Sequence, residues 1–445
     1  MHSQKIAFQD PLRVYERLFS PDSVLLESQK KGRYSYIATD PYMVFKSRGR
    51  RIEIIRGEKK TVKTGDPLKE LRRLIKSQKE KRKPGWPMFF SGAIGYISYD
   101  LVRLFEKIPE ISEDELGLYD LHMIFPENIV AFDHLKKTMT VLSKTGKGLE
   151  DTVKNIKEKK TKGNHPAKSM GKAEFKSNFT YPQYKKAVEK CREYVLAGDS
   201  FQIKISQMFS CKISEDPLTI YGRLRKINPS PYAALVNFGE CQMISCSPEH
   251  LVKIEKGVVE TRPIGGTYPR GKNRAEDLKI ARNFMSDEKE RAEHTMLIDL
   301  ERNDMGRVCA IGSVKVNEFM SLEKYSHLMH IVTNIRGKLA KGRDVFDVLR
   351  AMFPGGTITG CPKIRTMEII DEIEPTRRGP YTGSIGFITA AGEMDLNIII
   401  RTLLIKDGVG YIQVGGGIVA DSNQKREYEE TVDKAKALFE AVGGK

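Results

Sequence analysis

Neighbouring segments with strand-like alternation place the strongest constraint on how this chain can fold. RIEIIRG (51–57) and TMTVLSK (138–144) alternate apolar and polar residues as half-buried strands do, and FQIKISQMFS (201–210) is also typical of a strand. Helical patterns lie between some strands, but several neighbouring strands resemble hairpins rather than β-α-β units. The pattern therefore favours a mixed α/β or α+β sheet protein over a Rossmann fold.

Length and composition exclude several classes of protein. The 445 residues allow about three domains at ~150 residues each, and a hydrophobic fraction of 40% excludes disorder of the whole chain. The N-terminus lacks the apolar region of a signal peptide, and no run of 18 apolar residues could span a membrane. We therefore expect a cytoplasmic protein with no membrane partner. The six cysteines form no C-x-x-C pair, which argues against a disulfide scaffold or a zinc ribbon.

The chain divides into three regions by composition. Residues 1–150 read as mixed short elements, including a predicted helix over 67–83. Residues 151–174 form a Lys-rich connector or helix end, and 175–445 carries the densest motifs. The formal charge of +17 indicates an anionic partner. A nucleic-acid-binding tail is disfavoured because no aromatic residues are interleaved in the connector to stack on bases.

Two acidic stripes fall on predicted helices. Ser286 is a plausible N-cap for a helix over 286–304, which places Glu290 and Glu293 on one face. A second predicted helix, 421–443, aligns three more charged residues within roughly 60° of each other. These are Glu427, Glu430 and Lys434. Such pairs are most often exposed surface, but two of them facing each other suit Mg²⁺, which takes oxygen ligands.

Glycine-rich segments accompany the acidic stripes. RPIGGTYPRG (262–271) and FPGGTITGCPK (353–363) are predicted turns, and Gly415–Gly417 ends a strand just before the second acidic helix. Consecutive glycines let backbone N–H groups approach an anion closely, although each segment alone is a weak signal. Arg401 ends an apolar strand, where a structural ion pair is the commoner role.

Ordered motifs along the whole chain resemble one known family. The densest lie in the C-terminal region, and two further motifs lie near the N-terminus. They are DLERNDMGRV (299–308), YSHLMHIV (325–332), FPGGTITGCPKIRTMEIIDEIEP (353–375), MDLNIIIRT (394–402), GGGIVADS (415–422), EYEET (427–431), LLESQKKGRYSYIATDP (25–41) and GAIGYISYDLVRLFEKIP (92–109).

These motifs resemble the chorismate-utilising enzymes, a family that includes anthranilate synthase component I, aminodeoxychorismate synthase component I, isochorismate synthase and salicylate synthase. The resemblance implies an α+β protein with a single large fold, a β-sandwich core flanked by helices. It implies chorismate as substrate and Mg²⁺ as cofactor, with 1–150 as the N-terminal region of the amino-adding members and 175–445 as the catalytic region. A dianionic substrate suits a cation together with Arg, Lys and backbone donors.

The resemblance also implies a role for each site residue. Glu290, Glu293, Glu427 and Glu430 match the Mg²⁺ site that holds the ring carboxylate. The grip on the enolpyruvyl carboxylate is matched by Tyr381, Arg401, Gly415, Gly416, Gly417 and Lys434. Glu249 matches the general acid for the departing ring hydroxyl, while His330 and Thr267 match the remaining polar residues.

Two positions discriminate between the reactions of this family. Water-adding members carry Lys where this chain has Gln202, so the resemblance favours addition of ammonia. The second position is the residue before Gly-Thr in the motif PI-x-GT. Many aminodeoxychorismate synthases carry there a Lys that attacks the ring covalently, and anthranilate synthases typically carry Ala. This chain has Gly265. A minor hypothesis is that Lys204, on the strand face of Gln202, replaces the missing lysine.

Two products compete, and the balance favours aminodeoxychorismate. FPGGTITG and YTGSIGFI resemble aminodeoxychorismate synthases, and Ala233 stands where tryptophan-regulated anthranilate synthases usually place Met. FDH (132–134) and YDLVR (99–103) instead favour anthranilate synthase.

No cysteine has the G-x-C-x-G context of a glutaminase nucleophile. The resemblance therefore implies a separate glutamine amidotransferase subunit. A basic non-enzymatic binding protein is the alternative, but it does not explain the paired glutamates, and we expect no nucleic-acid partner.

Overall fold

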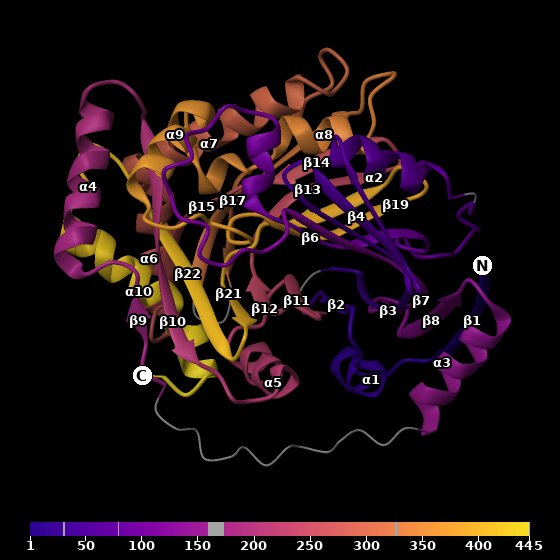
Figure 1. Ribbon diagram of the computed structural model, residues 1–445. Helices are drawn as coiled ribbons and strands as arrows, with labels where there is room; N and C mark the ends of the chain where they lie inside the picture. Colours follow the sequence, from indigo (N-terminus) through magenta and orange to yellow (C-terminus); the bar gives the residue numbers. More distant parts are fainter. Residues whose placement is uncertain (30–31, 79, 159–172, 325–327, 445) are drawn as a thin grey trace.

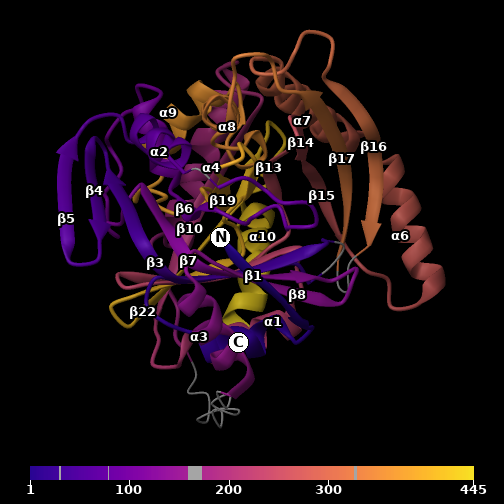
Figure 2. The ribbon, with the colours of Figure 1, turned by 90° about the vertical axis from the view of Figure 1, so that its right-hand side faces the viewer.

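The computed structural model describes residues 1–29, 32–78, 80–158, 173–324 and 328–444. The side chain of Thr267 also lies outside the described part. Figures 1 and 2 show strands through the middle of the molecule with helices packed above and below them.

The first 158 residues contribute a sheet-rich half. Its helices are α1 (Pro11–Leu18), α2 (Pro67–Lys76), the 3₁₀ helix η1 (Tyr99–Leu104) and α3 (Gly146–Glu158). Its strands are β1 (His2–Ala7), β2 (Ser23–Glu27), β3 (Tyr34–Arg48), β4 (Arg51–Arg56), β5 (Lys59–Thr64), β6 (Gly92–Ile97), β7 (Leu121–Asp133) and β8 (Thr138–Ser143).

The rest of the chain contributes further strands and most of the long helices. Its helices are α4 (Tyr181–Leu196), α5 (Pro217–Ile227), α6 (Arg274–Ser286), α7 (Glu288–Gly306), α8 (Val345–Met352), η2 (Gly356–Ile358), α9 (Lys363–Ile373) and α10 (Gln424–Ala441). Its strands are β9 (Lys176–Ser177), β10 (Gln202–Lys212), β11 (Tyr232–Phe238), β12 (Cys241–Ser247), β13 (His250–Glu255), β14 (Val258–Arg262), β15 (Ile264–Pro269), β16 (Lys315–Lys324), β17 (Leu328–Lys338), β18 (Gly360–Cys361), β19 (Ser384–Thr389), β20 (Met394–Asn397), β21 (Thr402–Lys406) and β22 (Val409–Ile418).

The named strands pair antiparallel wherever they form a ladder, within one hydrogen-bonded system of 22 strands. Ladders join the two halves of the chain, since β2 pairs with β11 and β6 pairs with β19. Hairpins such as β3–β4 and β11–β12 explain the closely spaced strand patterns of the sequence. The predicted α+β class is confirmed.

The core consists of three main layers of apolar contact. One cluster lies between strands, with Tyr36, Ile94 and Phe238 among its buried members, and forms the interior of the sandwich. A second cluster packs α2, α7 and α8 on the sheet, and a third packs α1, α3, α5 and α10 on it. Helices therefore flank a sheet-on-sheet core, as Figure 1 shows.

Helix boundaries differ from the sequence predictions at several ends. The helix predicted over 67–83 ends at Lys76, because the lysine-rich residues that follow have no apolar face to bury. α4 begins at Tyr181, because Thr180 and Gln183 form a capping box there. The predicted connector overlaps α3, which continues to Glu158, while residues 159–172 lie outside the described part.

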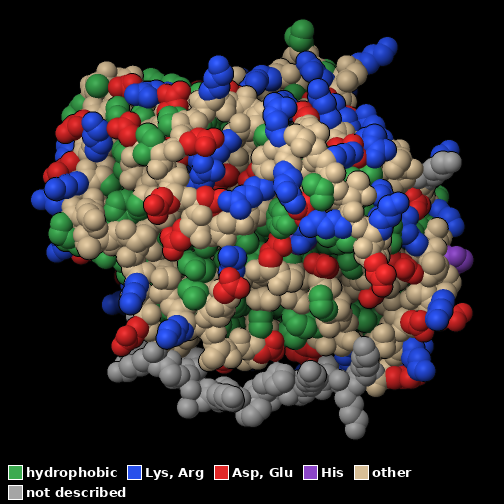
Figure 3. Space-filling view, in the orientation of Figure 1, with side chains coloured by type: hydrophobic (Ala, Val, Ile, Leu, Met, Phe, Trp, Pro, Cys, Tyr) green, Lys and Arg blue, Asp and Glu red, His purple; other side chains and the backbone are tan. Residues whose placement is uncertain are grey.

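Charged side chains of both signs are interspersed over the face in Figure 3. Among the described residues, no helix combines the length and apolar character needed to cross a membrane.

A buried ion pair joins α9 to the sheet. Arg378 Nη2 lies 2.8 Å from Glu374 Oε1, and both side chains are almost fully buried, at 2% and 3% exposure. Glu374 Oε1 accepts from the Ser206 backbone N–H at 2.8 Å, and Arg378 Nη2 donates to the Lys204 carbonyl at 2.6 Å. The pair therefore fixes the start of β10.

We predict that Arg378→Met lowers the free energy of unfolding by about 3–5 kcal/mol, because it leaves Glu374 as an uncompensated buried charge. Urea denaturation measures the change. The neighbouring Arg377→Met is the control and should cost at most about 1 kcal/mol, because its partner Glu110 is largely exposed. Equal losses in both variants would contradict the assigned importance of the buried pair.

Candidate active site

Two helices present the predicted glutamate pairs. α7 begins after Asp287, whose side chain accepts from the Lys289 and Glu290 N–H groups, and α10 begins after the Asn423 cap. The predicted Ser286 cap is wrong: Ser286 is the last residue of α6, and the longer reach of the Asp287 carboxylate satisfies the first turn of α7. Glu290 thus lies in the first turn of α7, and Glu293 lies in the next turn.

Three consecutive glycines of β22, Gly415 to Gly417, lie in close contact with the predicted site residues. A methyl group on Gly415 would lie 2.9 Å from the Tyr381 hydroxyl, and one on Gly416 would lie 3.4 Å from Glu427 Oε2. A methyl group on Gly417 would lie 2.6 Å from Lys204 Nζ and 2.9 Å from Gln202 Nε2. The missing side chains therefore allow groups from three segments of the chain to approach one strand. We call Gly415, Gly416 and Gly417 the glycine row.

Hydrogen bonds extend this arrangement to the other predicted residues. Gln202 Nε2 donates to Glu293 Oε2 at 3.1 Å, which links β10 to α7. Lys434 Nζ lies 2.7 Å from Glu430 Oε1 and donates to the Gly415 carbonyl at 2.9 Å. The structure therefore brings the two helices and the glycine row into one site.

Arg401 faces the same site without a structural counterion. Its backbone has a φ of +52°, and its carbonyl accepts from the Cys246 N–H at 3.1 Å, which fixes the residue between β20 and β21. Its guanidinium is electrostatically coupled to Tyr381 and Glu430. Within the described residues, no carboxylate oxygen lies within 4.0 Å of it. The ion pair that is common for such an arginine is not formed.

Burial and neighbouring glutamates raise the pKa of two of the four glutamates, Glu290 and Glu427. Burial, Glu293 and the opposite-helix Glu430 raise the pKa of Glu290, and burial raises the pKa of Glu427. Burial also acts on Glu430, but the Lys434 ammonium holds the pKa of that carboxyl below its usual value. A cation between the helices would relieve this repulsion.

These carboxylates fit a hard cation by chemistry, since they offer several oxygen ligands and, in the part of the chain that the structure describes, only Glu430 is paired with a lysine. Among the described residues, however, no three or more acidic, His or Cys side chains already stand at metal-binding separation. Mg²⁺ usually keeps several waters and binds through one or two carboxylates, so a closed protein shell is not required.

Burial shifts the pKa of both Glu249 and His330 toward the neutral form. Burial raises the pKa of Glu249, and its Oε1 has no hydrogen-bond partner in the described part of the chain. Burial lowers the pKa of His330 to about 4. Its Nδ1 lies 3.1 Å from the Gly266 carbonyl, and because a carbonyl only accepts, Nδ1 carries the proton. The Thr267 side chain, also predicted for the site, is outside the described part.

His294, which was not predicted for the site, occupies the space that a side chain at position 265 would need and so explains the unusual Gly265. A methyl group on Gly265 would lie 2.2 Å from His294 Nδ1, and one on Gly266 would lie 2.4 Å from Glu290 Oε2. His294 is fully buried, and its Nε2 lies 2.7 Å from Thr333 Oγ1. The sequence signal was the four-residue spacing from Glu290, which places His294 on the same face of α7.

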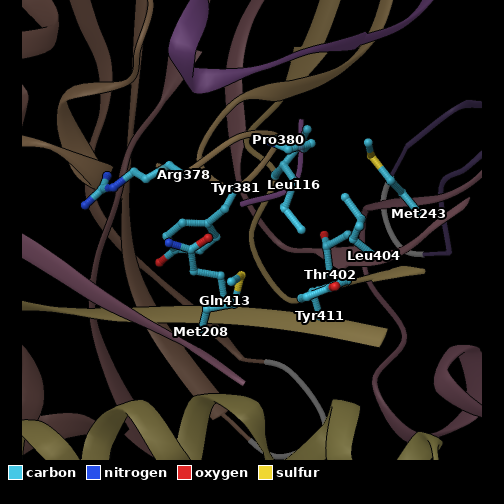
Figure 4. Close-up of a pocket in the computed structure, with 11 residues that line it drawn as sticks. Leu116, Met208, Met243, Arg378, Pro380, Tyr381, Thr402, Leu404, Tyr411 and Gln413 are labelled. Atoms are coloured by element: carbon cyan, nitrogen blue, oxygen red, sulfur yellow. The ribbon is translucent and has the colours of Figure 1, made fainter. Parts of the chain in front are cut away.

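Two cavities adjoin these elements. Tyr381 and Gln413 line a cavity of about 30 Å³, shown in Figure 4. A second cavity, of about 720 Å³, lies between the two halves of the chain and is lined by Glu27, Ser28 and Ala233, among others. Ala233, singled out in the sequence, therefore lines a large cavity.

Comparisons with known proteins identify the family. The model of the family described as chorismate binding enzyme matches residues 22–440. Anthranilate synthase component 1 of Thermus thermophilus is 41% identical over 445 residues, covering 98% of this chain and 95% of that protein. Aminodeoxychorismate synthase component 1 of Bacillus subtilis is 41% identical over 453 residues, covering 99% and 96%.

Solved structures share the fold. Anthranilate synthase component I from Streptococcus pneumoniae has a TM-score of 0.84 at 35% identity, over 99% of this chain and 100% of that one. MenF, the menaquinone-specific isochorismate synthase of Escherichia coli, has a TM-score of 0.77 at 14% identity, over 99% and 94%, a likeness of fold alone. Since the family model and these relatives extend over nearly the whole sequence, the chain belongs to the chorismate binding enzyme family.

Proposed function

We propose that this protein aminates chorismate, using ammonia supplied by a glutamine amidotransferase subunit. The observation that carries the proposal is the combination of charges around the glycine row. Arg401 offers a guanidinium with no carboxylate partner among the described residues, while Glu430 of α10 lies near enough to Glu290 of α7 to raise the pKa of that carboxyl. A dianionic substrate together with a divalent cation would balance both.

We propose Mg²⁺ as the cofactor, held by Glu290, Glu293, Glu427 and Glu430. When bound, the ion would neutralise the ring carboxylate of chorismate and polarise it. Tyr381, Arg401, Lys434 and the N–H groups of Gly415, Gly416 and Gly417 would orient the enolpyruvyl carboxylate at the other end.

Glu249 is proposed as the general acid that protonates the departing ring hydroxyl. Its raised pKa supports this role, because the carboxyl then keeps its proton closer to neutral pH. Neutral His330 and Thr267 would complete the polar surroundings.

Gln202 is proposed to receive the ammonia. Its Nε2 donates to Glu293, so its amide oxygen is the free end, and Oε1 is buried without a hydrogen-bond donor in the described part. An ammonia N–H can donate to that oxygen. A glutamine cannot act as a general base toward water, whereas ammonia is already a nucleophile.

The amidotransferase partner is inferred from the chemistry of the cysteines. Five of the six are buried and Cys361 is half-buried, and burial raises the pKa of the Cys361 thiol. A glutaminase needs an activated thiolate, which these environments disfavour. The names of the relatives, component 1, agree with a two-component enzyme.

We propose 4-amino-4-deoxychorismate, a precursor of 4-aminobenzoate and folate, as the product. FPGGTITG (353–360) and Ala233 in the large cavity support it. Anthranilate, the tryptophan precursor, is the second candidate, because a relative named anthranilate synthase is also 41% identical.

The test incubates the purified chain with chorismate, Mg²⁺ and ammonium and identifies products by mass spectrometry, with and without aminodeoxychorismate lyase. A product that becomes 4-aminobenzoate only with the lyase supports the proposal. Anthranilate without the lyase establishes the second candidate, and unchanged chorismate refutes amination.

We predict that Glu430→Gln abolishes Mg²⁺-dependent turnover, a loss of at least ~100-fold, because a metal ligand is removed. Steady-state rates across an Mg²⁺ titration measure it. Glu429→Gln, one position along the same helix and exposed, is the control and should behave as wild type. Full activity of Glu430→Gln would refute the metal assignment.

The proposed acid predicts a pH dependence. Because protonated Glu249 is the active form and burial raises its pKa, kcat should fall as pH rises through that raised pKa. The profile is measured at a constant concentration of free ammonia, which removes the titration of ammonium itself. Glu249→Gln should lose activity at every pH, and wild-type kcat in that variant would exclude the role.

The contact between Gly265 and His294 predicts coupled stabilities. Gly265→Ala should cost about 1–3 kcal/mol of unfolding free energy, because the new methyl group would meet the buried imidazole. In the His294→Ala background this cost should largely disappear. Gly239→Ala, where no atom lies within 4 Å of the added methyl group, is the neutral control in the same urea titrations. An unchanged cost in the His294→Ala background would contradict the contact.

A further inference from the structure

Lys204 lies in the site but has no role so far. It is the third residue of β10 and pairs with Gly417 of β22 in the antiparallel ladder. Its Nζ and Gln202 Nε2 both lie over Gly417, so the two side chains share one face of β10. A side chain at position 417 would close this space, since a methyl group there would lie 2.6 Å from Nζ.

The backbone of Lys204 is fixed by hydrogen bonds, whereas its ammonium forms no ion pair among the described residues. The Lys204 N–H donates to the Thr359 carbonyl at 2.8 Å, and the Lys204 carbonyl accepts from buried Arg378 at 2.6 Å. Within residues 1–29, 32–78, 80–158, 173–324 and 328–444, no carboxylate oxygen lies within 4.0 Å of Nζ. The neighbouring Lys434, by contrast, is paired with Glu430.

The surroundings of Lys204 favour an anionic ligand. Burial and the nearby Lys434 lower the pKa of Lys204, while Glu293, Glu430 and Glu249 act in the opposite direction. A half-buried ammonium without an ion pair is costly in the free protein. An anion that entered the site would recover this cost, whereas Glu293 is already bonded to Gln202.

We propose that Lys204 is a substrate-binding residue whose ammonium pairs with the enolpyruvyl carboxylate of the substrate beside Gly417, within the glycine row that would orient this carboxylate. This inference rests on the proposed function, because it takes chorismate as the dianion. Lys204 then positions the ring for attack by ammonia held at Gln202, its neighbour on the same strand face.

The test measures chorismate affinity by titration calorimetry, with Mg²⁺ and without ammonium, so that no turnover occurs. Lys204→Met should raise Kd by about 10–100-fold, the range for a hydrogen bond to a charged group. Lys204→Arg, which keeps the charge, should retain most of the affinity. Lys212→Met, at the exposed far end of β10, is the matched control and should bind as wild type.

Two further readouts separate binding from other roles. Without ligand, Lys204→Met should melt at or above the wild-type temperature, because an unpaired, partly buried charge is removed. In steady state it should raise KM for chorismate more than it lowers kcat. A fall in melting temperature would indicate a structural role, and a lost kcat with unchanged Kd would indicate a chemical one; either result overturns the proposal.

Wild-type affinity in Lys204→Met also overturns the proposal while leaving chorismate amination intact. If the wild-type protein neither binds nor converts chorismate, the proposed function itself fails and takes this inference with it. The wild-type titration therefore distinguishes the two failures.

Discussion

The buried ion pair between Arg378 and Glu374 is the interaction on which the site depends. It joins the end of α9 to the start of β10, because Glu374 accepts from Ser206 and Arg378 donates to the Lys204 carbonyl. Two charges so fully buried are stabilising only when their hydrogen bonds are satisfied, as they are here. These hydrogen bonds thereby fix the position of β10, which carries Gln202 and Lys204, beside the glycine row.

The glycine row leaves open space beside this fixed strand. Antiparallel pairing sets Lys204 opposite Gly417 and Ser206 opposite Gly415, so side chains reach across β22 without obstruction. Tyr381, Glu427 and Gln202 each approach a glycine that has no side chain to exclude them. Polar groups from distant parts of the sequence can therefore converge on one strand, which a row of larger residues would prevent.

The charges of the site do not balance without a ligand. Burial and neighbouring glutamates raise the pKa of Glu290 and of Glu427, while Arg401 and Lys204 lack carboxylate partners in the described part of the chain. Like charges held close and cations left unpaired both cost free energy in a buried site. A divalent cation and a dianion would relieve both, which links the geometry to chorismate chemistry rather than to a nucleic-acid surface.

The sequence alone determined the antiparallel class of the fold, the glutamate pairs and the glycine run, because these depend on local spacing along one strand or helix. Only the tertiary structure decided which distant groups meet. It placed His294 against Gly265 and left Arg401 without the ion pair expected of it. These outcomes depend on contacts between segments that lie far apart in the sequence, and the spacing within any single segment does not determine them.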